Sequence, residues 1–368
     1  MKSLEISKLL LCHDNGDISD MASGVALNIA RRLKLPVVGL HGYNALMHEG
    51  AFRIMEPTLP TEYQTEEILK KQREVHASLI RVGMEKISLS YLKPLEPIFK
   101  DADIPFTPKV REGKNFRALN ELIHEEDSDS LVVIGNSGFN HSESGFVGSV
   151  CMRTLRQCSG RNILIVKDNK SLQGADFVVC LDGSSSAIYS LRVAAYMAER
   201  FNAKLHLLYV FDSALHNDLF KRLKDTLIND NGFNFNTKDQ EKIHDEFIDK
   251  GLARVGHMIL NRAEKEVFGK SGGSADAENL HVAMHGFGLV GEGIQNGNGL
   301  KKTVLSGHIY KRICDYAAET AAALIFAGRT GRHHAEGIDL GSVCENVVRY
   351  SPCNVVVTKS EDYKGWEL

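Results

Sequence analysis

The sequence of 368 residues has no excess of either charge and no long hydrophobic run. Its 44 lysine and arginine residues nearly balance 47 acidic residues, so the net charge is −3. This balance argues against a nucleic-acid-binding surface and against an acidic interaction tail. The most apolar stretch, residues 321–327, is far too short to cross a bilayer. We therefore expect a protein that binds neither nucleic acid nor a membrane.

The cysteines also lack a pattern. There are seven, an odd number, and no two have C-x-x-C spacing. Several lie in apolar runs, where cysteine behaves as a small hydrophobic residue. We expect a cytoplasmic protein. The seven are Cys12, Cys151, Cys158, Cys180, Cys314, Cys344 and Cys353.

What the sequence does contain is an alternation of apolar, strand-like segments with helix-periodic segments, which predicts parallel sheets covered by helices on both faces. The alternation restarts after a polar segment at residues 167–174. Together with the length, this restart predicts two α/β domains, residues 1–170 and 171–368. The predicted strands are 4–12, 36–41, 106–110, 131–135 and 162–166 in the first half, and 177–181, 204–210, 303–306, 322–327 and 354–358 in the second.

Helical periodicity is clearest in three places. One helix is predicted to start at Asp20, and one in the second half is predicted to be capped by Ser185 or Ser186. A charged helix is predicted over residues 61–86, where the residues on or near one apolar stripe are Ile68, Val75, Leu79 and Val82.

A glycine pattern occurs twice with identical spacing, G-x2-G-x9-G-S, each time directly after an apolar strand. Consecutive backbone N–H groups and the start of a helix can hold a phosphate there, and glycine lets the phosphate approach the backbone. One such copy is weak evidence, because tight turns use glycine without any ligand, whereas the repeat favours an anion site. The first copy is Gly135, Gly138, Gly148 and Ser149, and the second is Gly328, Gly331, Gly341 and Ser342.

The first strand of each half ends at an aspartate, Asp14 or Asp182, which we expect at the same sheet edge as the glycine loop. The two aspartates are 168 residues apart, but Gly135 and Gly328 are 193 apart. The second half therefore contains an insertion, which we assign to residues 269–299 because that segment holds nine of the 32 glycines.

With these features, the chain resembles a tandem universal stress protein, two domains of that family in one polypeptide. The resemblance covers nearly the whole chain except the insertion and the long helical region before it. It implies a Rossmann-like, five-stranded parallel sheet in each half. It also implies ATP, with Mg²⁺ on its phosphates, held by the glycine loop, with the ribose on the strand-end aspartate and the adenine after the second strand.

Carried onto this sequence, the resemblance favours the second half as the nucleotide site. Asp182, Gly183 and Ser184 fit the family's opening, Val210 takes the adenine-facing place, and the loop after Gly328 begins with Arg329. The first half departs from the pattern, because Gly42 stands where valine is common and its loop contains Glu143 but no lysine or arginine. A carboxylate near a phosphate costs about 1–4 kcal/mol. We therefore expect Asp14, Gly135, Gly138, Gly148 and Ser149 to form a weaker or vestigial site.

The resemblance leaves three functions open: a nucleotide-binding regulatory protein of a stress response, a slow ATPase on the same fold, and a ligand-free interaction module. No catalytic residue is assigned, because no histidine and acid pair lies near either serine in the sequence. A homodimer beyond the internal pair and an unknown protein partner are both compatible with the sequence.

Two further motifs in the insertion are set aside. Residues 286–291 spell G-x-G-x-x-G, but the glycines that follow make the helix of a dinucleotide site improbable. His281 and His285, with the pair at 333–334, do not supply a defined set of three or four ligands, so we expect no metal site.

Overall fold

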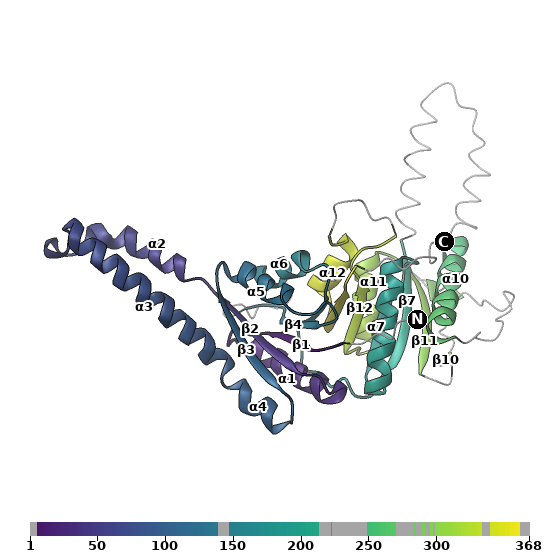
Figure 1. Ribbon diagram of the computed structural model, residues 1–368. Coiled ribbons are helices and arrows are strands. Elements are labelled where there is room, and N and C mark those ends of the chain that lie inside the picture. The colour runs from purple at the N-terminus through teal and green to yellow at the C-terminus, as the bar shows by residue number, and fades with distance from the viewer. Residues whose placement is uncertain are drawn as a thin grey trace, which may run out of the picture. The chain divides into compact units, whose positions relative to one another are not determined.

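The structure is a computed structural model that describes residues 6–138, 147–212, 222, 249–269, 283–284, 289–290, 295–296, 299–332 and 339–360 (Figure 1). The chain divides into two compact units, Met1–Asn169 and Lys170–Leu368. Each unit is built around its own parallel strands.

In the first unit the described strands are all parallel and follow the order β3-β2-β1-β4-β5. Strands β1, β4 and β5 are buried along their full length, as expected for apolar strands of a parallel sheet. Figure 1 shows α5 and α6 on one side of this sheet and α1 on the other. The elements are β1 (Leu9–Cys12), α1 (Asp17–Leu33), β2 (Val37–Tyr43), α2 (Ala45–Met55), the 3₁₀ turns η1 (Glu56–Thr58) and η2 (Thr61–Tyr63), α3 (Glu66–Leu92), α4 (Leu95–Asp101), β3 (Phe106–Glu112), α5 (Asn115–His124), β4 (Leu131–Gly135), α6 (Ser149–Gln157) and β5 (Asn162–Val166).

The second unit repeats this arrangement, with the described strands in the order β10-β11-β7-β6-β12-β13. The short β10 is antiparallel to β11 and adds an edge to the five parallel strands, while β8 and β9 pair only with each other. The elements are β6 (Asp176–Cys180), α7 (Ser185–Phe201), β7 (Lys204–Phe211), α10 (Asp249–Phe268), β8 (Ala283–Met284), β9 (Leu289–Val290), β10 (Gln295–Asn296), β11 (Leu300–Ser306), α11 (Ile309–Glu319), β12 (Leu324–Gly328), α12 (Ser342–Tyr350) and β13 (Asn354–Thr358).

The strand register is the same in the two units. Leu11 of β1 lies beside Val133 of β4, and Val179 of β6 lies beside Phe326 of β12. In both pairs the first residue precedes the strand-end aspartate by three positions and the second precedes the first loop glycine by two. The α/β architecture predicted from the sequence is therefore confirmed in both units. In each unit the strand-end aspartate and the start of the glycine loop follow neighbouring strands at the same edge of the sheet.

Two helix starts differ from the predictions. Helix α1 begins at Asp17 after the N-cap Gly16, not at Asp20, and Ser19 Oγ accepts a hydrogen bond from the Gly16 N–H at 3.0 Å. Helix α7 is capped by Ser184, whose hydroxyl accepts from the Ala187 N–H at 3.2 Å. Ser185 and Ser186 are the first two residues of the helix. Neither is the N-cap, because the N-cap residue precedes the first turn.

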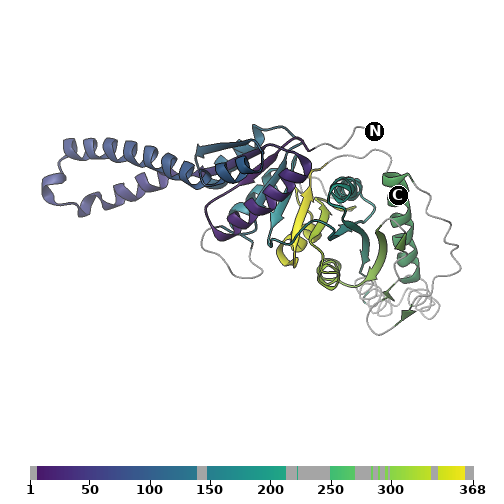
Figure 2. The same cartoon turned by 90° about the horizontal axis from the view of Figure 1, so that it is seen from below.

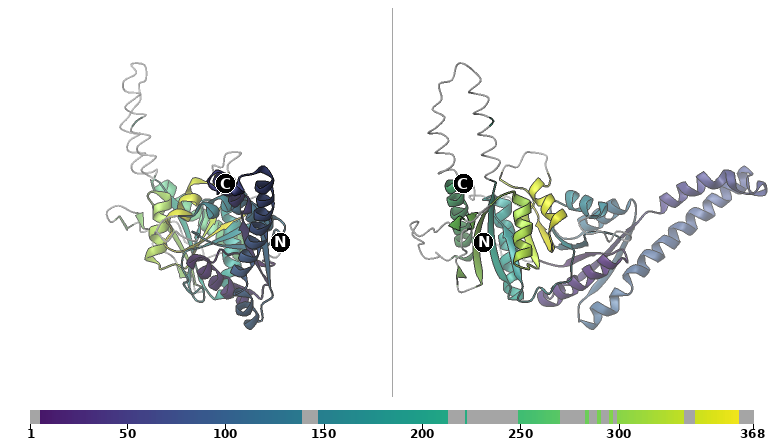
Figure 3. Two further views of the ribbon diagram at one scale, coloured as in Figure 1. Left: turned by 90° about the vertical axis from the view of Figure 1, so that its left-hand side faces the viewer. Right: turned by 180° about the vertical axis from the view of Figure 1, so that it is seen from behind.

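A helical pair, α2 and α3, follows β2 in the first unit. It extends from the end of the sheet (Figures 2 and 3). The charged segment predicted as one helix is α3, which runs to Leu92, whereas α2 was not predicted. The two helices are joined by a stacked contact between Phe52 and His76, with ring centroids 4.3 Å apart, and by Arg73, which donates to Glu56 at 2.6 Å.

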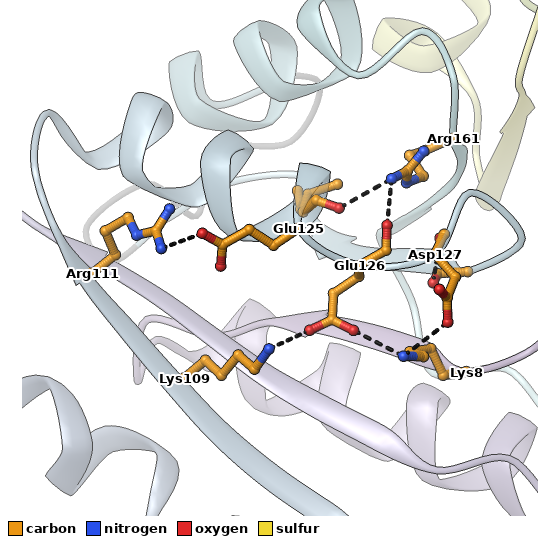
Figure 4. A network of polar contacts seen from close by, with 9 residues as sticks. Lys8, Lys109, Arg111, Glu125, Glu126, Asp127 and Arg161 are labelled. Carbon is orange, nitrogen blue, oxygen red and sulfur yellow. Dashed lines mark hydrogen bonds and ion pairs between the residues drawn. The ribbon is translucent and has the colours of Figure 1, made fainter.

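A polar network fixes the end of α5 to β1 and β3 (Figure 4). The buried Glu126 carboxylate accepts from Lys8 at 2.9 Å and from Lys109 at 2.5 Å, and its backbone carbonyl accepts from Arg161 at 2.6 Å. Burial by itself raises the pKa of Glu126, but the hydrogen bonds from Lys109 and Lys8 outweigh it, so the pKa is lowered.

Candidate functional site

In both units the strand-end aspartate touches the second glycine of the loop. A Cβ atom on Gly138 would lie 3.0 Å from Asp14 Oδ2, and one on Gly331 would lie 2.9 Å from Asp182 Oδ2. A side chain at either glycine would therefore displace the carboxylate. The fold brings together the aspartate and the glycine loop, as predicted from the sequence, at the carboxyl ends of the strands.

Asp182 orders the backbone around it. Its Oδ1 accepts from the Ser184 N–H at 2.9 Å, and its Oδ2 accepts from the Arg332 N–H at 3.0 Å. Asp14 makes the first of these contacts, with the Gly16 N–H at 3.2 Å. Each carboxylate oxygen has two lone pairs, so the Asp182 carboxylate can still accept a hydrogen bond from a ligand hydroxyl.

The first glycine of each loop has a packing role. A Cβ atom would lie 2.7 Å from Ile18 Cγ2 at Gly135, and 2.7 Å from Ser186 Oγ at Gly328. Helices α1 and α7 pass close to the ends of β4 and β12 at these points. This contact accounts for both glycines without a ligand.

The third glycine of each loop caps a helix. The Gly148 N–H donates to the Asn136 carbonyl at 2.6 Å and precedes α6, and the Gly341 N–H donates to the Arg329 carbonyl at 2.9 Å and precedes α12. At Gly341 a Cβ atom would meet no atom of the described residues closer than 3.4 Å. Protein packing therefore leaves room at Gly341, and the bare backbone there lies at the start of a helix, next to the exposed Ser342.

Because Arg329 stands in a glycine-rich loop of the sequence, its side chain is expected to be exposed, but the structure buries it. Its side chain is 0% exposed. Burial raises the pKa of the Cys344 thiol to about 12, and the nearby Arg329 charge partly opposes that rise. The Arg329 side chain is therefore buried, and its charge acts on Cys344 of α12.

The first unit contains a cavity of about 460 Å³ at the same strand ends. Its polar lining includes Asp14, His13 and His41, and no lysine or arginine is among its described lining residues. The His41 Nδ1–H donates to the His13 carbonyl at 2.7 Å, which leaves Nε2 as an acceptor. Burial lowers the pKa of His41, so the ring is neutral near pH 7. The cavity is lined by Cys12, His13, Asp14, Ser19, Leu40, His41, Gly42, Tyr91, Asn115, Leu119, Ile134, Gly135, Ser137, Gly138, Gly148, Ser149, Val150 and Cys151.

Sequence reasoning missed His13, His41 and Tyr91. Tyr91, in the last turn of α3, lies edge-on to His41 with ring centroids 5.3 Å apart. The sequence did contain one signal for His41. It stands near the end of β2, and the corresponding residue of β7, Tyr209, also has a ring side chain. Tyr91 carried no such signal, because it reaches the cavity from a helix predicted to end five residues earlier.

Gly42 is fixed by packing. A Cβ atom there would lie 2.7 Å from the Asn115 carbonyl oxygen, at the start of α5. The second unit has the half-buried Val210 at the matching place in β7. The two units therefore differ where an adenine-facing side chain is expected.

Several predicted features lie outside the described residues: the loop 139–146 with Glu143, the histidine pair 333–334, His281 with His285, and the motif at 286–291 apart from residues 289–290. Within the described ranges, no three His, Cys, Asp or Glu side chains group as ligands of a metal ion. No helix in those ranges is both long and apolar enough to span a membrane.

Comparison with known proteins agrees with this architecture. Residues 271–359 match the model of the universal stress protein family, a segment that includes the second glycine loop. A structure of a functionally unknown protein from Pseudomonas aeruginosa is 12% identical, covers 97% of this chain and 94% of that chain, and has a TM-score of 0.56. A universal stress protein from Archaeoglobus fulgidus is 16% identical, covers 98% of this chain and 99% of that chain, and has a TM-score of 0.52. No curated protein matches the chain. At these identities the structures show a shared fold that extends over both halves.

Proposed function

We propose that the chain is a cytoplasmic stress-response protein that binds ATP with Mg²⁺, mainly in its second unit, and that binding regulates its conformation or partners. The observation that carries the proposal is the contact between a strand-end carboxylate and a loop glycine, present twice with nearly the same distance. The proposal is also supported by the family match, which covers Gly328, Arg329, Gly331 and Gly341.

Each residue then has a role that its contacts support. The phosphates bind the bare backbone at Gly331 and Gly341 and the Ser342 hydroxyl at the start of α12. Asp182 accepts a ribose hydroxyl. Gly183, with φ of +83°, and Ser184 form the turn that orients Asp182, and Val210 packs against the adenine.

Gly328 and Arg329 support the site from behind. Gly328 allows α7 to approach β12, and the Arg329 carbonyl holds the Gly341 N–H. Mg²⁺ typically keeps several waters and binds through phosphates with one or two carboxylates. The absence of a three-ligand cluster in the described residues is compatible with that mode.

Charge favours the second unit over the first. The charge of Arg332 counteracts the burial that raises the pKa of Tyr209, so this arginine lies close to the end of β7. The described lining of the first cavity offers Asp14 and two histidines but no lysine or arginine. A triphosphate is held less well by that lining, so we assign Asp14, Gly138, Gly148 and Ser149 to a weaker site.

The first test is to purify the protein natively, denature it and identify released nucleotide by chromatography and mass spectrometry. We expect about one ATP or ADP per chain. Two per chain would contradict the preference for the second unit. No release, together with no binding of added Mg-ATP, would contradict nucleotide binding altogether and favour a ligand-free interaction module.

A matched pair of variants assigns the site. Gly331→Val moves the Asp182 carboxylate, and we expect it to weaken Mg-ATP binding at least tenfold by isothermal titration calorimetry. Gly138→Val makes the same change against Asp14 in the first unit and should leave the affinity within about twofold. The reverse pattern would place the main site in the first unit.

A further inference from the structure

The helical pair α2 and α3 carries an unusual share of exposed apolar side chains. Ten of the fifteen large apolar side chains that are exposed in the described part of the chain lie between residues 46 and 89. Figure 3 shows the pair extended from the first unit. This exposed surface is a candidate for association, and it is separate from the residues that line the cavity, which α3 reaches through Tyr91.

The apolar side chains of α3 form a stripe beside its contact with α2. Arg73 and His76 mark the face that packs on α2. At 3.6 residues per turn, Val75 and Val82 project away from both of these residues, and Leu79 lies at the edge of the stripe nearest His76. All three are exposed, at 51%, 43% and 67% respectively.

This stripe has the spacing of a coiled coil. Ile68, Val75, Val82 and Leu89 follow one another at intervals of seven, and Leu79 stands four residues after Val75. Apolar residues repeated in this way over three or more heptads are typical of helices that pack along their length against another helix. The seam residues that complete the heptads are Gln72 and Lys86.

The seam is complementary to itself when two copies run antiparallel with Leu79 at the centre. Val75 of one copy then lies against Val82 of the other, and Ile68 lies against Leu89. At the flanks, Lys71 of one copy comes near Glu85 of the other. The seam's own polar positions also match, because a glutamine carbonyl at position 72 accepts from a lysine at position 86. An arrangement in which each copy presents the same surface has the twofold symmetry most common among oligomers.

The available surface is adequate for a dimer. Residues 68–89 span about 33 Å of helix. Half of the surface of a helix of this length and about 11 Å in diameter is on the order of 500 Å² per copy. Two copies would bury about 1,000 Å² in total, the lower limit for a biological interface. We propose that two copies of this chain associate through antiparallel pairing of α3 along the seam of Ile68, Val75, Leu79, Val82 and Leu89.

The test is the oligomeric state of the full chain, measured by sedimentation velocity from 1 to 50 µM. We expect a dimer that Leu79→Glu weakens at least tenfold, because the two introduced carboxylates face each other across the symmetry axis. Leu79 is 67% exposed, so the substitution should leave the circular dichroism spectrum unchanged. The matched control is Ile54→Glu, which removes an even more exposed apolar side chain, at 80%, from α2. It should sediment as the wild type does.

A cysteine at the proposed centre adds a positional test. Leu79→Cys should form an interchain disulfide under mild oxidation, and Ile54→Cys should not. Background should be low, because six of the seven native cysteines are buried and Cys180 is half-buried. A monomeric wild type at 50 µM, a Leu79→Glu variant that dimerises normally, or equal effects of Leu79→Glu and Ile54→Glu would each overturn the proposal.

Discussion

At the scale of single residues, the buried cysteines are held as protonated thiols, which are poor nucleophiles. Cys151 is 2% exposed, and burial raises its pKa to about 12. Because the thiolate is the reactive form, less than about one thiol in a thousand is reactive at pH 8. The cysteines therefore serve packing, in agreement with their apolar sequence context.

We predict that iodoacetamide at pH 8 leaves Cys151 and Cys344 unmodified in the native protein and labels both in urea. Burial raises the pKa of each of these thiols to about 12. Peptide mass spectrometry after timed labelling measures each site separately. Rapid labelling of Cys151 without denaturant would show that the cavity wall it belongs to is open.

Glu126 gives a prediction about acid stability. Its folded pKa is lowered below the ordinary value of 4.5, so its stabilising contribution is present in full above that value and is lost as the pH falls through the folded pKa. Glu126→Gln should cost about 1–2 kcal/mol at pH 7, since hydrogen bonds to charged groups contribute on that scale. The difference from wild type should shrink at pH 3.

Urea unfolding followed by circular dichroism at both pH values measures this effect. The neighbouring Glu125→Gln is the control, because that carboxylate is half exposed and its ion pair with Arg111 should contribute less than about 1 kcal/mol. Equal losses in the two variants would contradict a special role for the Glu126 network.

At the scale of elements, the glycine loop combines packing positions and ligand positions. Gly328→Ala should destabilise the second unit by about 1–3 kcal/mol, because its Cβ atom would lie 2.7 Å from Ser186 Oγ and within 3 Å of the α7 backbone. Gly341→Ala should change stability by less than about 0.5 kcal/mol, as expected where no protein contact is strained.

Thermal unfolding and Mg-ATP titration of the same two variants separate these roles. We expect Gly341→Ala to weaken binding while it keeps its melting temperature, because the added methyl group occupies space at the helix start. A Gly341→Ala protein that binds as the wild type does would remove the backbone at Gly341 from the proposed phosphate site.

The elements also mark how far the sequence could lead. Apolar strands and the repeated glycine spacing predicted the parallel sheets and the sheet edge where aspartate and loop meet. Helix α2 was missed, because its outward side chains are apolar and its segment lacks a clear polar face. The packing role of Gly328 depends on Ser186, which lies 142 residues away in the sequence. Local pattern contains no information about such a contact.

At the scale of the whole molecule, the two units share strand order and register but differ in the chemistry of their strand ends. The two units differ at Gly42 against Val210, and the described lining of the first cavity contains no lysine or arginine. Sequence reasoning leaves the preference for the second unit as a prediction. It did not predict the burial of Arg329, because arginine is mostly exposed and its partner surface is assembled only by the fold. Nor did it predict the meeting of His41 with Tyr91, which depends on where α3 returns to the sheet.

Because Tyr91 contacts His41, a small rotation of α3 at this end produces a larger displacement at its far end. Its last turn touches the cavity of the first unit through Tyr91, and its 27 residues extend for about 40 Å from there. A tilt of about 5° at the base would carry the far end sideways by roughly 3.5 Å. A molecule that displaced the His41 ring and tilted α3 would therefore move the α3 seam sideways. If that tilt changed how two α3 helices pair, pairing would in turn change how readily the cavity is filled.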